Sequence, residues 1–361
     1  MNTNSRGNKN IIWKQCLASS MSKELYVSVD IGGTWVKVVL ADENELKIKI
    51  SSKTIKKGPI NALPNQVIGM IKRALKETKA SKEDIKAIGS SSAGPFINRK
   101  LLAATNICGK ENDWEVIPYI PALEKEFGLD VEYDLENDCV SAIHAEHLFG
   151  AARGFRNAVY LTISTGIGGG IIAENILIEG KGKNAGHFGH MIVKKRGDLC
   201  SCGLRGCIES IASARNIARR AKNAGFMWKG SQDYGAKEVF EGYRNQDKTA
   251  TEIIKETIEY LAIMVINVIN ITDTNLIILG GSVMKNADVL LEPIKDYIVQ
   301  HSIAAIAEGV VFSLPELGDF VGDLGGLSLI IPEQLKNKWV EEKPWTCDVK
   351  EIFLTQDECF Q

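Results

Sequence analysis

The chain has 361 residues, of which 45% are hydrophobic and 24% charged, and its formal net charge is −2. This length predicts two domains rather than a single core, and the near-neutral charge gives no electrostatic basis for binding nucleic acid or an anionic membrane. The longest apolar stretch, 260–271, is too short to span a bilayer. Residues 1–22 are polar, and we expect them to form an N-terminal extension outside the fold.

The first half of the chain predicts the element order β-β-β-α-β. Hydrophobic runs at 25–31, 36–41 and 46–51 predict three strands, the last two joined by a turn at 42–44. Helical spacing of apolar residues follows over 63–79, and a strand is expected at 85–90.

The second half predicts the same order again. Strands are expected at 157–164, 170–173 and 176–179, then a long helix at about 250–271 and a strand at 275–279. Each half places a glycine-rich loop between its first two strands. The repetition predicts a duplicated α/β fold of two domains, with the functional site in the cleft between them.

The two glycine-rich loops are candidate phosphate sites. Asp30-Ile31-Gly32-Gly33-Thr34 ends a buried strand, and glycines let backbone N–H groups approach an anion, while Asp30 is a candidate Mg²⁺ ligand. A plain hairpin turn is the alternative. The second loop, Thr165 to Gly170, holds four glycines in six residues, which a plain turn does not require. Neither loop is a Walker A motif.

Glu136-Asn137-Asp138 lies between a short strand and a helix of small and apolar residues. Asn or Asp at this point commonly caps the helix. Alternatively, a carboxylate at a helix N-terminus accepts the proton of a hydroxyl that attacks phosphorus. Both interpretations stay open from the residues alone.

One histidine and three cysteines lie within a short stretch: His190, Cys200, Cys202 and Cys207. His with three Cys is a set of ligands used by structural zinc, and the intervening glycines permit the tight turns that bring them together. A disulfide or a chance cluster is the alternative. The remaining cysteines show no disulfide framework and no signal peptide is evident, so we expect a reducing cytoplasm.

Taken together, the chain resembles the ROK family (repressors, open reading frames, sugar kinases). The motifs that carry the resemblance run in order along the chain: Asp30 to Thr34, Ala93-Gly94-Pro95, Thr105-Asn106-Ile107 with Trp114, Glu136-Asn137-Asp138, Thr165 to Gly170, Ala185 to His190, and Cys200 to Glu209.

The resemblance implies an actin-like, ribonuclease H-like sugar-kinase fold and a homodimer or higher oligomer. The N-terminal domain would comprise 23–135 plus about 322–340, and the C-terminal domain 136–321 with a zinc loop at 190–207. Residues 341–361 would form a tail.

It also implies ATP-dependent phosphorylation of a hexose, glucose at O6 foremost, with Mg²⁺ and structural zinc as cofactors. Asp138 would be the general base. The implied sugar contacts are Gly94, Asn106, Asn137, Asp138, His187, His190 and Glu209. The implied ATP and phosphate contacts are Asp30, Gly32, Gly33, Thr34, Thr165, Gly166, Gly168, Gly169, Gly280 and Gly281. The implied zinc ligands are His190, Cys200, Cys202 and Cys207.

One position departs from the family pattern. His187 stands where the family usually has a glutamate that contacts the sugar, so an N-acetylhexosamine (N-acetylglucosamine or N-acetylmannosamine) is the alternative substrate. Otherwise His187 packs against Phe188 and another group contacts the sugar. A non-catalytic sugar sensor is a further alternative, which the phosphate loops and Asp138 oppose. A repressor is not expected, because too few residues precede the first strand for a DNA-binding module.

Overall fold

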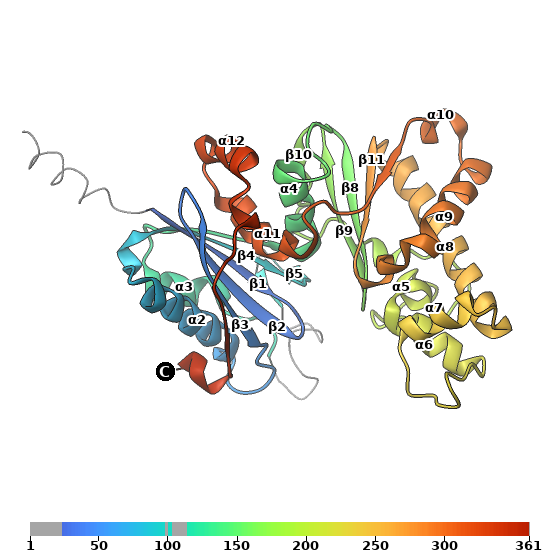
Figure 1. The fold of residues 1–361 in the computed structure, drawn as a ribbon, viewed down its shortest axis with the longest axis horizontal. Helices are drawn as coiled ribbons and strands as arrows, with labels where there is room; N and C mark the ends of the chain where they lie inside the picture. The colour runs from blue at the N-terminus through green and yellow to red at the C-terminus, as the bar shows by residue number, and fades with distance from the viewer. Residues whose placement is uncertain (1–23, 98–99, 103–113, 361) are drawn as a thin grey trace, which may run out of the picture.

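The computed structural model describes residues 24–97, 100–102 and 114–360. These residues form two α/β halves, each built on its own sheet with helices packed against it (Figure 1). Among the described residues, no helix is both long enough and apolar enough to cross a bilayer.

The first sheet has six strands in the order β13-β3-β2-β1-β4-β7. β1, β2 and β3 are antiparallel neighbours, whereas β4 and β7 run parallel to β1. The bounds are β1 (Leu25–Ile31), β2 (Trp35–Ala41), β3 (Leu46–Lys53), β4 (Ile85–Ser92), β7 (Glu132–Asn137) and β13 (Glu351–Leu354); a separate hairpin pairs β5 (Phe96–Ile97) with β6 (Lys100–Leu101).

The second sheet has five strands in the order β10-β9-β8-β11-β12. Their bounds are β8 (Ala158–Ile163), β9 (Ile167–Ala173), β10 (Ile176–Leu177), β11 (Leu276–Gly280) and β12 (Val311–Ser313). This order repeats β3-β2-β1-β4-β7 position by position, with the same antiparallel and parallel pairs. The predicted duplicated α/β fold is therefore confirmed.

Helices separate and cover the two sheets. α2 (Ala62–Thr78) packs on β2 and β3 beside α3 (Tyr119–Phe127), while α4 (Asp138–Phe149) and α11 (Val321–Ile330) pack together between the halves (Figure 1). α11 approaches β4 closely, because a Cβ at Gly326 would lie 2.5 Å from the carbonyl oxygen of Gly89. β7 stays in the first sheet as far as Asn137, past the boundary expected at 135.

The helices of the second half enclose a large apolar core around α8 (Lys248–Thr272). The others in this half are α5 (Glu209–Ala212), α6 (Ala214–Asn223), α7 (Ala236–Arg244), α9 (Ala287–His301) and α10 (Ala304–Ala307). Short 3₁₀ turns also occur, of which η2 (Phe188–His190) and η6 (Asp357–Phe360) are used below.

Residues 341–360 of the predicted tail instead pack on the N-terminal half. Beyond α12 (Glu333–Glu342), the ring centroid of Trp345 lies 5.3 Å from that of Phe149 on α4, beside Trp339 of α12, whose centroid is 6.2 Å from the same ring. The chain then forms β13 along the outer edge of β3, and η6 contacts α2 (Figure 1). The prediction of a tail was wrong here because its apolar side chains have partners on distant elements.

Candidate active site and metal centre

A cavity of about 570 Å³ lies between the halves. Loops from both sheets line it. The lining residues are Gly33, Thr34, Lys56, Ala93, Gly94, Asn137, Asp138, Cys139, Thr162, Ser164, Thr165, Gly166, Ile167, Gly168, Gly186, His187, His190 and Glu209. Polar groups therefore converge from segments far apart in sequence, as expected of a ligand site.

The first glycine-rich loop turns the chain from β1 into β2. The N–H of Gly32 donates to the carbonyl of Trp35 at 2.9 Å, which tightens the turn, and Gly33 and Thr34 line the cavity. Asp30 lies behind the loop, where its Oδ1 accepts a hydrogen bond from the Ser91 hydroxyl at 3.3 Å. Burial raises the pKa of Asp30 to about 6, although Lys37 opposes the shift.

The second glycine-rich loop connects β8 and β9. Thr165, Gly166 and Gly168 line the cavity. Gly169 does not, and its lack of a side chain serves packing: a Cβ there would lie 2.4 Å from the Tyr160 carbonyl oxygen and 2.7 Å from the Phe188 ring.

Gly280 and Gly281 lie at the end of β11 and do not line the cavity. A Cβ at Gly280 would lie 2.4 Å from the Tyr160 hydroxyl, and one at Gly281 would lie 2.5 Å from the Ile163 carbonyl oxygen. These glycines thus permit β11 to pack against β8. Ser282, the next residue, lines a separate hollow of about 620 Å³ beside α7.

Asn137 and Asp138 share the N-terminus of α4. Asn137 is the N-cap, because its Oδ1 accepts the N–H of Cys139 at 2.9 Å, and Asp138 Oδ1 accepts the same N–H at 2.9 Å. Both side chains also line the cavity. Burial raises the pKa of Asp138, while its hydrogen bonds with Cys139 and the charge of His187 oppose the shift. A carboxylate with a raised pKa is a stronger proton acceptor.

Histidines form one wall of the cavity. His187 precedes η2 and His190 ends it, and their rings meet edge to face with centroids 6.2 Å apart. Phe188 turns the other way, into the core of the second half. His187 faces the cavity, and burial lowers the pKa of its imidazole, which favours the neutral ring.

Of the other predicted sugar contacts, Gly94 lines the same cavity, whereas Asn106 lies outside the described residues.

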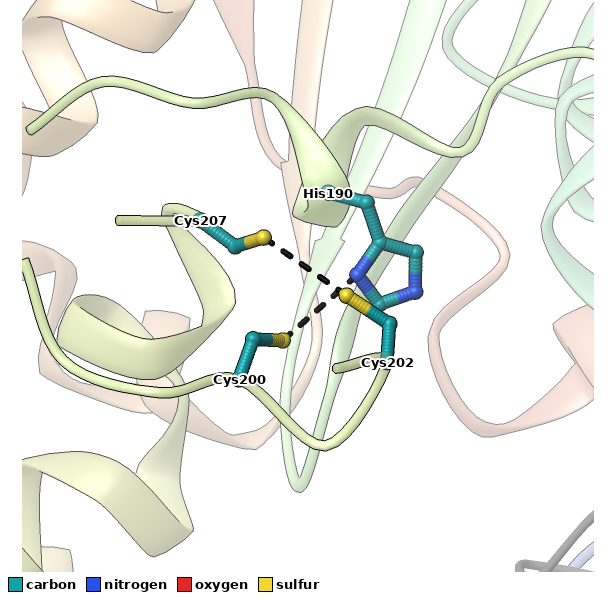
Figure 2. Close-up of side chains that lie close together, drawn as sticks. All are labelled: His190, Cys200, Cys202 and Cys207. Carbon is teal, nitrogen blue, oxygen red and sulfur yellow. Dashed lines mark hydrogen bonds between the residues drawn. The ribbon is translucent and has the colours of Figure 1, made fainter. Parts of the chain in front are cut away.

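His190, Cys200, Cys202 and Cys207 lie together, with their ligand atoms all within 4.8 Å of one another (Figure 2). The Sγ atoms of Cys202 and Cys207 are 3.7 Å apart, and His190 Nδ1 is 3.7 Å from Cys200 Sγ. Tetrahedral zinc with Zn–S bonds of about 2.3 Å would place its sulfurs about 3.8 Å apart. The donor set therefore fits zinc, and because Nδ1 faces the thiols, the Nε2 atom of His190 is left for the cavity.

Glu209 joins the cysteine loop to the second glycine-rich loop. It begins α5, directly after the turn that follows Cys207. One carboxylate oxygen accepts the N–H of Ile167 at 3.0 Å, and the other accepts the Ser201 hydroxyl at 3.1 Å. Glu209 is therefore held between the two loops.

Two lysines at or behind the site escaped sequence reasoning. Lys56 lines the cavity beside Thr34. Lys183 is buried behind it, with its Nζ at 2.8 Å from Asp134, 3.1 Å from Glu136 and 3.1 Å from Glu179. Burial raises the pKa of Glu136 to about 7, although Lys183 opposes this. Lys56 belongs to a group of five lysines within residues 47–57, and such a group can indicate a site for an anion. The spacing of these lysines did not show which of them lines the cavity.

A second hollow, of about 490 Å³, is lined by Thr165 and by basic residues of α6. No site at these basic residues was predicted from the sequence. Arg215, Arg219, Lys222 and Tyr234 contribute to its walls. This hollow reaches the second glycine-rich loop, because Thr165 also lines it.

The sequence and the fold were also compared with known proteins. A family model described as ROK family matches residues 26–333. A glucokinase from Halalkalibacterium halodurans is 32% identical over 320 residues, 85% of this chain and 94% of the relative. An N-acetylmannosamine kinase from Haemophilus influenzae is 30% identical over 257 residues, 71% of this chain and 80% of the relative.

Among solved structures, a ROK family glucokinase from Streptomyces griseus in complex with glucose and AMPPNP is similar with a TM-score of 0.66 and 27% identity. The likeness covers 84% of this chain and 98% of that one. The actin-like sugar-kinase fold expected from the motifs is thus confirmed. On the family match and these relatives, the chain belongs to the ROK family.

Proposed function

We propose that this protein transfers the γ-phosphoryl group of ATP to a hexose hydroxyl, with glucose at O6 as the foremost acceptor. The observation that carries the proposal is the position of Asp138, which lines one cavity together with the glycine-rich loops of both halves. The relatives named glucokinase and the similar structure with glucose and AMPPNP support it.

In this reaction Asp138 is the general base. Its carboxylate accepts the hydroxyl proton as the sugar oxygen forms a bond to the γ-phosphorus, and the bond from phosphorus to the bridging oxygen of ADP breaks. The pKa of Asp138, raised by burial, increases its affinity for that proton. Bound Mg²⁺ neutralises negative charge on the phosphates.

The two glycine-rich loops would hold the phosphates from opposite sides. Backbone N–H groups of Gly33, Thr34, Thr165 and Gly166 would be the donors, whereas those of Gly32 and Ile167 already donate to Trp35 and Glu209. Asp30 does not line the cavity, and we propose that it acts on a bound cation through its charge. The hollows beside α6 and α7 continue from Thr165 and Ser282 and suit the adenosine.

The sugar would lie against Gly94, Asn137, His187, His190 and Glu209. Zinc, held by His190, Cys200, Cys202 and Cys207, is proposed as a structural ion, because four protein ligands leave no open position for chemistry. It would fix the His190 ring so that Nε2 addresses a sugar hydroxyl. Asn106 keeps its proposed sugar contact from the family pattern.

An N-acetylhexosamine is the second candidate acceptor, and His187 is the observation that favours it. The residue faces the cavity where a glutamate is usual in the family, and the relatives include N-acetylmannosamine kinases. A neutral imidazole has one hydrogen-bond donor and one acceptor, whereas an ionised carboxylate only accepts.

A coupled assay of ADP release across glucose, mannose, N-acetylglucosamine and N-acetylmannosamine tests the proposal. We expect ADP release that depends on one of these sugars, and His187→Glu should change the ratio of kcat/KM between glucose and the N-acetyl sugars by about 10–100-fold. ATP binding without turnover of any sugar would instead indicate a sensor. Homodimerisation is proposed as well, and light scattering of the purified protein tests it.

A further inference from the structure

The C-terminal segment, residues 350–360, lies beyond the family match, which ends at residue 333. Its strand β13 pairs in parallel with β3 and forms the edge of the first sheet (Figure 1). The second sheet ends at β10, which corresponds to β3. β13 therefore has no counterpart in the second half and is an addition to the duplicated fold.

The C-terminal segment is anchored on the N-terminal half. Leu354 and Cys359 are buried in the core beneath α2. The backbone also fits closely, because a Cβ at Gly69 of α2 would lie 1.5 Å from the carbonyl oxygen of Cys359. Only glycine allows this approach, so the segment has a defined place on the helix.

Hydrogen bonds connect this segment to the first glycine-rich loop. The side-chain amide of Gln356 donates to the carbonyl oxygens of Lys53 at 3.2 Å and Thr54 at 3.1 Å. Thr54 in turn donates its N–H to the carbonyl of Thr34 at 2.9 Å and its hydroxyl to the carbonyl of Gly32 at 2.7 Å. Gln356 is thus connected through Thr54 to both Gly32 and Thr34 of the loop.

A ring contact also connects the C-terminal segment to Trp35, the residue that follows this loop. Phe353 of β13 meets Trp35 edge on, with ring centroids 5.9 Å apart, and Trp35 directly follows Thr34. The side chain of Phe353 is 64% exposed, so little core packing depends on it. The chain also continues from Thr54 to Lys56, which lines the cavity.

We propose that the C-terminal segment positions the first glycine-rich loop for the nucleotide phosphates, with Gln356 and Phe353 as positioning residues. The proposal rests on the proposed function, since it takes the loop as a phosphate site. A glycine-rich loop loses conformational freedom when its N–H groups converge on an anion. Contacts that hold the loop in place before the nucleotide binds reduce this loss of conformational freedom, which strengthens nucleotide binding.

Steady-state kinetics of the full-length protein test the proposal. Gln356→Glu has the same shape but lacks the N–H donors, and Phe353→Ala removes the ring. Each should raise the KM for ATP by about 3–10-fold, the effect of one neutral hydrogen bond or contact, and should leave the KM for the sugar within about twofold. Phe360→Ala is the matched control, because Phe360 is a 51% exposed ring in the same segment.

Gly69→Ala provides a second route that leaves the segment's sequence intact. The added methyl group would displace the terminal turn at Cys359, although alanine is otherwise favoured in a helix. We expect the same rise in KM for ATP.

Two results would overturn the inference. If Gln356→Glu and Phe353→Ala leave the KM for ATP unchanged, or raise it equally for ATP and sugar, the segment only covers the sheet edge. If the wild-type protein phosphorylates a sugar and the variants keep its KM for ATP, this inference fails and the proposed function stands. A wild-type protein that phosphorylates no sugar and binds no AMPPNP in calorimetry defeats the proposed function and this inference together.

Discussion

Glu209 and Ile167 are joined by a hydrogen bond of 3.0 Å from the backbone N–H of Ile167 to the carboxylate of Glu209. The other carboxylate oxygen accepts the Ser201 hydroxyl inside the cysteine loop. Glu209 therefore links the position of the cysteine loop to that of the second glycine-rich loop. This bond connects the candidate metal centre to the loop that we propose binds phosphate.

Glu209→Ala should raise the KM for the sugar by about 10–100-fold, because hydrogen bonds to a charged group contribute about 1.5–3 kcal/mol. The KM for ATP should rise less. Glu209→Gln keeps a carbonyl oxygen that can accept from Ile167, so its KM for the sugar should lie between those of the wild type and Glu209→Ala. Glu252→Ala, at an exposed position on α8, is the control. An unchanged KM for the sugar in Glu209→Ala would exclude the proposed contact.

Asp138→Asn should lower kcat by about 10²–10⁴-fold, the usual contribution of a general base, while the protein stays folded. Asp130→Asn, at an exposed position outside the cavity, should retain full activity. Steady-state kinetics and circular dichroism on the same samples check both expectations. Full activity of Asp138→Asn would mean that another group is the base.

The pKa of Asp138 also predicts a dependence on pH. Because burial raises this pKa in the folded state, ionising the carboxyl destabilises the fold as pH rises above the unfolded value. The Tm of Asp138→Asn at pH 7 should therefore equal or exceed that of wild type, and the difference should shrink toward pH 4. For the same reason, when the pH is lowered, wild-type kcat/KM should begin to fall at a higher pH than it would if the base were an exposed aspartate. A lower Tm for the variant at pH 7 would contradict this account.

Cys202→Ala should remove one of four zinc ligands and lower zinc affinity by at least about tenfold, since even groups behind metal ligands contribute about 10–100-fold. Cys202 is exposed, so the substitution leaves no buried cavity. Zinc content by mass spectrometry should fall, and the KM for the sugar should rise because His190 loses its fixed orientation. Cys347→Ala, another exposed cysteine, should change neither quantity. Normal zinc content with normal sugar affinity in Cys202→Ala would end the proposed coupling.

Lys183→Met should destabilise the protein by about 3–5 kcal/mol at pH 8, because it leaves Glu136 buried without its cation. The pKa of Glu136 is already raised to about 7, so at pH 5 the carboxyl is protonated and the loss should be smaller. Urea denaturation at both pH values measures the difference. Lys181→Met, exposed and close in sequence, is the control. An equal loss at both pH values would show that packing, rather than charge, explains it.

Local chemistry made the strands, the glycine-rich loops and the clustering of the candidate metal ligands predictable from sequence. Cys200, Cys202 and Cys207 are joined by short turns, so residue type and spacing almost determine their geometry. The duplicated strand order was equally visible, because each strand is a separate hydrophobic run bounded by turns. For Asn137 the capping interpretation is confirmed, and Asp138 lines the cavity, while its role as the general base stays a prediction.

Contacts between distant segments were decided only by tertiary structure. Glu351 on β13 accepts a hydrogen bond from Ser51, 300 residues earlier, and no local pattern identifies β3 as the partner of that strand. The burial of Lys183 among carboxylates and the packing role of Gly280 likewise depend on which elements meet. The sequence by itself therefore determined the chemical groups and the local turns, whereas tertiary packing decided which of them share a cavity, because packing alone brings residues far apart in the chain into contact.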